Sequence, residues 1–235
     1  MIVKTNLHKI IMMNPSIILT SITLLFTSGI APNLWKTQNP DSSLTSSAEI
    51  ADQNELIIDS DLTIEEALQG KTLPKKIKDS LTLIDVEYYS FDGKLHRGQV
   101  VIHKSVAQDI TEIFDIIKKT GFPIEKVIPI SQYNWSDEAS MQDNNTSAFN
   151  YRFISGSKIL SMHAQGLAID INPKLNPYIK NHLIAPEGAS YNTMIPGTID
   201  DTSRIVAEFK IRGWQWGGDW KKLKDYQHFE KRLGN

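Results

Sequence analysis

The stretch "SMHAQGLAIDINP", residues 161–173, decides the fold prediction. Within it, the run LAIDIN at 167–172 places a large aliphatic side chain at every second position. A period of two predicts a half-buried β-strand. Asp170 would lie in the middle of the polar face, and His163 precedes it by seven residues. A carboxylate inside a sheet, with a histidine close by, suggests a functional site rather than an ordinary polar surface.

A second block, DYQHFE at 225–230, contains Asp225 and His228. A catalytic zinc typically takes three protein ligands from His and Asp or Glu and leaves a fourth position for water. His163, Asp170 and His228 make such a set, and Asp225 would then be free to act as general base. The spacing equally allows Asp170 to pair with a Lys or Arg, and both histidines to be surface groups.

The chain has no cysteine, so any metal must be held by His, Asp or Glu. The remaining histidines are not part of a comparable pattern of acidic residues, and no role is assigned to them: His8, His96, His103 and His182.

The segments SMHAQGLAID, GGDW and DYQHFE, in this order, resemble the M15 metallopeptidase family. This family contains zinc D-alanyl-D-alanine carboxypeptidases and L-alanyl-D-glutamate endopeptidases. The resemblance extends from about Leu81 to Glu230, includes FNYRF at 149–153, and does not cover the first 60 residues. It implies one zinc ion per chain, held by His163, Asp170 and His228.

The resemblance also implies roles for residues around the metal. Asp225 corresponds to the catalytic acid and base, and Arg152 to an arginine that binds the substrate carboxylate or the carbonyl oxygen. Ser161 either contacts the substrate or only orients its loop, and Arg152 could instead form a surface salt bridge. Asp219 is a candidate partner for a ligand histidine.

The implied reaction is hydrolysis of a peptide bond in peptidoglycan stem peptides, in the manner of a D-alanyl-D-alanine carboxypeptidase. An Asp three residues before the last His is similar to the endopeptidase branch, so an L-alanyl-D-glutamate endopeptidase stays open. So do an exported domain that binds cell wall without cleaving it and a secreted interaction domain in which the His and Asp residues are incidental.

The predicted fold is α+β, with a small antiparallel sheet, flanking helices and a zinc-binding cleft on the sheet. Asp-Gly at 92–93 predicts a hairpin over 81–103. The expected helices lie at 61–70, 105–121 and 200–213, capped by Asp61 or Thr63, by Ser105, and by Asp200 or Thr202. The expected strands lie at 122–133, 149–154, 166–173 and 225–232, with loops at 134–148 and 174–198.

Three glycines and three tryptophans carry further expectations. Gly166 should let the chain fold back so that His163 reaches the metal, while Gly217 and Gly218 should allow a sharp turn before the last strand. The tryptophans could line the cleft or belong to the core: Trp214, Trp216 and Trp220.

The N-terminus differs from the rest of the chain. Residues 1–31 contain two lysines, no acidic residue and an apolar run at 10–31, which predicts a cleaved signal peptide or a retained membrane anchor. Residues 32–60 read as a polar linker, and 61–235 as the M15-like domain. The chain would be exported to the periplasm or cell envelope. With 25 basic and 27 acidic residues and no basic stripe, nucleic-acid binding is not expected.

Overall fold

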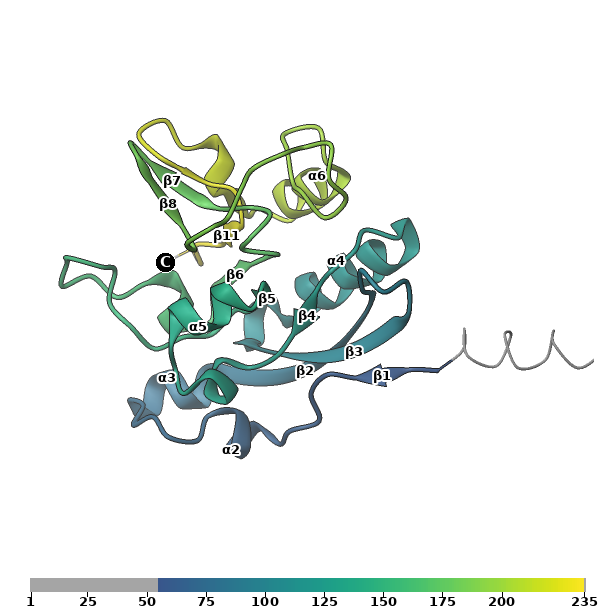
Figure 1. Cartoon of the computed structure of the whole chain (residues 1–235). Helices are drawn as coiled ribbons and strands as arrows, with labels where there is room; N and C mark the ends of the chain where they lie inside the picture. Colours follow the sequence, from purple (N-terminus) through teal and green to yellow (C-terminus); the bar gives the residue numbers. More distant parts are fainter. Residues whose placement is uncertain (1–54, 235) are drawn as a thin grey trace, which may run out of the picture. The chain divides into compact units, whose positions relative to one another are not determined.

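A computed structural model of the chain describes residues 55–234, which combine helices with several small sheets (Figure 1). The predicted α+β class is confirmed. The segment at 1–31 and most of the linker at 32–60 lie outside these residues. In the part described, no helix is long and apolar enough to cross a bilayer. The fold begins earlier than position 61, because strand β1 (Ile57–Ile58) pairs in parallel with β3.

The predicted hairpin is confirmed as strands β2 (Leu81–Tyr89) and β3 (Leu95–His103). They pair antiparallel along their whole length, from Leu81 opposite His103 to Tyr89 opposite Leu95. The Asp-Gly turn closes as expected: Gly93 has a φ of 78°, and the Asp92 carboxylate accepts a hydrogen bond from the backbone N–H of Lys94.

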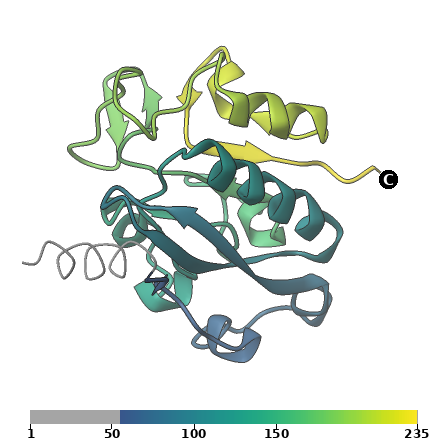
Figure 2. The ribbon, with the colours of Figure 1, turned by 90° about the vertical axis from the view of Figure 1, so that its right-hand side faces the viewer.

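Helix α4 (Ala107–Thr120) lies across one face of this hairpin (Figure 2). Its buried side chains repeat every three or four residues and end at Gly121, which adopts the left-handed conformation. Ser105 does not cap this helix. It lies in a 3₁₀ turn, η1 (Lys104–Val106), because the ring of His103 accepts its backbone N–H.

The other face of the hairpin is covered by two short helices, α2 (Ile64–Ala67) and α3 (Lys75–Ser80). Thr63 caps α2 in a reciprocal arrangement with Glu66, as the sequence predicts. Alternate residues of β3 supply the two cores, since Val100 and Ile102 join the α4 side while Val101 joins the α2 side. Helix α3 was not predicted.

A second sheet places the residues of the 161–173 stretch. Strand β11 (His228–Glu230) lies between β6 (Ala168–Asp170) and β9 (Gln215–Trp216), and both pairings are antiparallel. Ile169 and Phe229 face each other in the core. The prediction of a half-buried strand is wrong, because the face with Asp170 is also buried.

Helix α6 (Arg204–Ile211) packs against α4 and β9, and it begins after Ser203 rather than at the predicted caps. Asp200 instead accepts hydrogen bonds from the backbone N–H of Thr202 and the hydroxyl of Ser203. A third sheet consists of β10 (Lys224–Asp225), β7 (Tyr178–Lys180) and β8 (Leu183–Ala185). The predicted loop at 174–198 is therefore wrong over β7 and β8.

The segment before the site departs most from prediction. Only β4 (Lys126–Val127) is strand within 122–133, and Pro129 starts a 3₁₀ turn, η2 (Ile130–Tyr133). The predicted loop at 134–148 contains helix α5 (Asp137–Gln142) and strand β5 (Asn145–Thr146), which pairs in parallel with β4. The predicted strand at 149–154 is reduced to one bridge between Phe153 and Leu160.

Candidate metal centre

His163, Asp170 and His228 come together as a buried group, with ligand atoms close enough to share one ion. His163 Nε2 lies 3.1 Å from His228 Nδ1 and 3.3 Å from one oxygen of Asp170. The other oxygen of Asp170 lies 2.9 Å from His228 Nδ1. Ligands at bonds of about 2.0–2.1 Å in a tetrahedral site would be about 3.3 Å apart, so the donor set fits such an ion.

Two of the three residues are placed by strand register. Asp170 on β6 lies directly opposite His228 on β11, so their side chains leave the sheet on the same face. On the side of β6 away from β11, Asp170 forms two backbone hydrogen bonds with Ser147. Pairing over three residues is therefore enough to bring a carboxylate and an imidazole from distant parts of the chain together.

The third residue is placed by a tight turn. His163 belongs to a 3₁₀ turn, η3 (Met162–Gln165), which Ser161 caps by accepting the backbone N–H of His163. The turn ends at Gly166, with a φ of 68°. A Cβ at this position would lie 2.7 Å from the backbone N of His103. As predicted, glycine here returns the chain so that His163 faces Asp170.

The outward nitrogen of each histidine also has an acceptor. His163 Nδ1 bonds to the carbonyl of Ala148, and His228 Nε2 lies 3.2 Å from a carboxylate oxygen of Glu230. These contacts leave the inward nitrogens as potential metal ligands. Sequence reasoning missed Glu230, although its position two residues after His228 on one strand is a usable signal. Asp219, the predicted partner, instead pairs with Lys210 at 2.7 Å.

The residues of the buried group shift each other's pKa values. Burial alone would raise the pKa of Asp170, but the charge of His163 and hydrogen bonds from both histidines hold it below its usual range. Burial would lower the pKa of His228, but hydrogen bonds to Asp170 and Glu230 raise it to about 10. The site without metal therefore favours an ionised carboxylate and a protonated His228.

The charges of this group also change the pKa of Asp225. Burial raises the pKa of Asp225 to about 6, His228 opposes this rise, and the Asp170 carboxylate adds to it. Gly217 allows the approach of β10, since a Cβ there would meet the Asp225 carbonyl oxygen at 2.4 Å. Neither Gly217 nor Gly218 has a positive φ, so close packing explains these glycines better than the predicted sharp turn.

Arg152 forms an ion pair with Asp137 at 2.9 Å, and about a third of each side chain is exposed. Asp137 also accepts a hydrogen bond from Asn150. The salt-bridge alternative for Arg152 is thus present in the structure, and part of the Arg152 side chain stays exposed. Ser161 is buried, and its observed contact is the cap on His163, which fits an orienting role.

The tryptophans divide between the two predicted locations. Trp214 and Trp216 are core residues. Trp220 is half-buried, and its ring centroid lies 5.4 Å from that of His228. Only Trp220 therefore lies where it could form a wall of the site.

Comparison with known families adds to this geometry. Residues 155–231 match the family model of the M15 peptidases described as D-alanyl-D-alanine carboxypeptidase. This segment, called the M15 segment below, covers 77 of the 235 residues. The M15 segment contains the three grouped residues, Asp225 and Ser161, and it begins after Arg152 and the FNYRF motif. No solved structure matches the chain.

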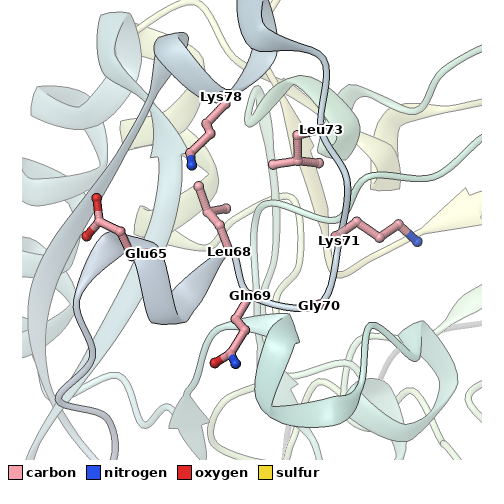
Figure 3. A pocket seen from close by; sticks show the side chains of 7 residues that line it. All are labelled: Glu65, Leu68, Gln69, Gly70, Lys71, Leu73 and Lys78. Atoms are coloured by element: carbon pink, nitrogen blue, oxygen red, sulfur yellow. The ribbon is translucent and has the colours of Figure 1, made fainter.

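A separate hollow of about 340 Å³ lies between α2 and α3, and Leu68 and Lys78 point into it (Figure 3). It shares no residue with the M15 segment. Its lining consists of Glu65, Leu68, Gln69, Gly70, Lys71, Leu73 and Lys78.

Proposed function

We propose that the protein is a zinc-dependent peptidase that hydrolyses a peptide bond in peptidoglycan stem peptides, in the manner of a D-alanyl-D-alanine carboxypeptidase. One observation carries the proposal: the buried His163–Asp170–His228 group lies within the segment that matches the D-alanyl-D-alanine carboxypeptidase model. These three residues are the proposed zinc ligands, for one ion per chain.

A zinc ion in this group would lower the pKa of a bound water and polarise the scissile carbonyl. Asp225 would take the proton from the attacking water and return it to the leaving amine. In the metal-free protein, burial raises the pKa of Asp225 to about 6, which brings this carboxyl closer to the neutral pH at which it would accept and donate a proton. Arg152, whose side chain is partly exposed, would bind a substrate carboxylate or the carbonyl oxygen.

The proposed substrate lies outside the cytoplasm, which agrees with the export signal expected at residues 1–31. We therefore propose a periplasmic or cell-envelope location, with residues 10–31 as a membrane anchor if the signal is retained.

The test is to incubate the zinc-loaded chain with muropeptides that end in D-Ala-D-Ala and to identify the products by mass spectrometry. Release of free D-Ala, abolished in His163→Ala and kept in Asp219→Asn, would support the carboxypeptidase. Asp219 is a suitable control because it is paired with Lys210 outside the group.

Other products would change the proposal. Cleavage between L-Ala and D-Glu would assign the chain to the endopeptidases. Zinc binding and retention on peptidoglycan without any cleavage would favour a binding domain that keeps the fold and the metal.

A further inference from the structure

Glu230 is placed beside His228 by the geometry of strand β11. The two residues are two positions apart, so both side chains leave the strand on the same face. In the register with β6, His228 lies opposite Asp170 and Glu230 lies opposite Ala168.

Glu230 is 8% exposed, so its carboxylate needs partners inside the protein. One oxygen lies 3.2 Å from His228 Nε2. The other lies 3.4 Å from a guanidinium nitrogen of Arg232, whose side chain is 73% exposed. The contact with the imidazole is therefore the shorter and the more buried of the two.

The contact has a direct consequence for the metal site. A carboxylate can only accept a hydrogen bond, so it requires a hydrogen on Nε2 of His228. Nδ1 faces Asp170 and His163, so it is the nitrogen that can exchange its proton for a metal. His163 has only the neutral carbonyl of Ala148 in the corresponding position. The two histidines are thus held by different chemical groups.

We propose that Glu230 is the positioning residue of His228: it fixes the ring and the Nε2–H tautomer, and its negative charge strengthens zinc binding through Nδ1. The inference rests on the proposed function, since the ion concerned is the one assigned to His163, Asp170 and His228. The competing explanation is structural, with Glu230 serving as the partner of Arg232.

The variants Glu230→Ala, Glu230→Gln and Arg232→Ala separate the two explanations. The first removes the acceptor and the charge, and the second keeps an acceptor of similar volume but removes the charge. The third removes the exposed partner and leaves the contact with His228. Zinc affinity of the full chain, measured by competition with a chromophoric chelator at fixed pH, is the main readout.

We expect Glu230→Ala to weaken zinc binding by about 10- to 100-fold. Glu230→Gln should lose less affinity, because its amide oxygen still accepts from Nε2, and Arg232→Ala should stay within about twofold of the unchanged chain. In ¹⁵N NMR spectra of the zinc-loaded chain, His228 should show a protected Nε2–H signal that Glu230→Gln retains. If Glu230→Ala does not fold, Glu230→Gln and Arg232→Ala still provide the comparison.

Affinities of Glu230→Ala and Glu230→Gln equal to that of the unchanged chain would overturn the inference, as would a loss in Arg232→Ala as large as that in Glu230→Ala. These outcomes are distinct from failure of the proposed function, which would appear as a chain that binds zinc but cleaves no stem peptide. A chain that binds no zinc would overturn both.

Discussion

Replacement of Gly166 by alanine tests how the site is assembled. At a φ of 68°, an alanine is in the left-handed region, and its Cβ would lie 2.7 Å from both His103 N and Leu81 Cδ2. The left-handed conformation costs about 1–2 kcal/mol and overpacking against backbone adds about 1–3 kcal/mol, so we expect a loss of about 2–5 kcal/mol. For a domain of this size, that lowers the melting temperature by about 4–20 °C.

Gly156→Ala provides the matched control. Gly156 has a φ of 72°, but nothing lies within 4 Å of the added Cβ, so this variant carries only the conformational cost. The assay is urea unfolding and thermal melting of both variants after zinc removal, followed by circular dichroism. The difference between them should be about 1–3 kcal/mol, which is the steric part. A Gly166→Ala variant as stable as Gly156→Ala would refute the close packing of η3 against β3.

The remaining predictions concern the chemistry of the site. Asp225→Asn should lower kcat by about 10²- to 10⁴-fold while zinc content stays at that of the unchanged chain; loss of zinc would instead make Asp225 a ligand. Because hydrogen bonds to two carboxylates raise the pKa of His228 to about 10 against the effect of burial, a proton competes with the metal for this ring. Apparent zinc affinity should therefore increase with pH, by about tenfold per unit between pH 6 and 9, in chelator competition; a flat profile would contradict the raised pKa. Arg152→Ala should reduce kcat/KM by about 10- to 100-fold, the value of one charge-assisted hydrogen bond, with zinc content unchanged. An unchanged kcat/KM would leave Arg152 with only its structural pairing to Asp137.

The sequence predicts the parts of the fold that have strong local signals. The hairpin at 81–103 follows from alternation and Asp-Gly, and α4 follows from its apolar period and Gly121. The prediction is wrong in two parts of the segment 122–148. The predicted strand gives way to a 3₁₀ turn after Pro129, and the predicted loop contains a short polar helix capped by Ser136. Short elements of this kind depend on tertiary contacts more than on local propensity.

The three candidate metal ligands could be predicted from the sequence, but the hydrogen-bond partners of the two histidines could not. The spacing left alternatives open, and the resemblance to the M15 family identified His163, Asp170 and His228 as the set that the structure brings together. Asp219 was the wrong partner, because its carboxylate pairs with Lys210 on α6. Its position in the sequence does not show in which direction its side chain points. Glu230 could have been identified from strand periodicity, provided that the strand at 228–230 was known to carry the histidine.

The most direct test of the account is the metal content of the purified chain, measured by mass spectrometry beside Asp170→Ala. Asp170 is the group that bridges both histidines, at 2.9 and 3.3 Å, so its removal should abolish binding. The account predicts about one zinc per chain in the unchanged protein and almost none in the variant. Absence of zinc in the unchanged protein, or equal zinc in both, would contradict a metal centre at His163, Asp170 and His228.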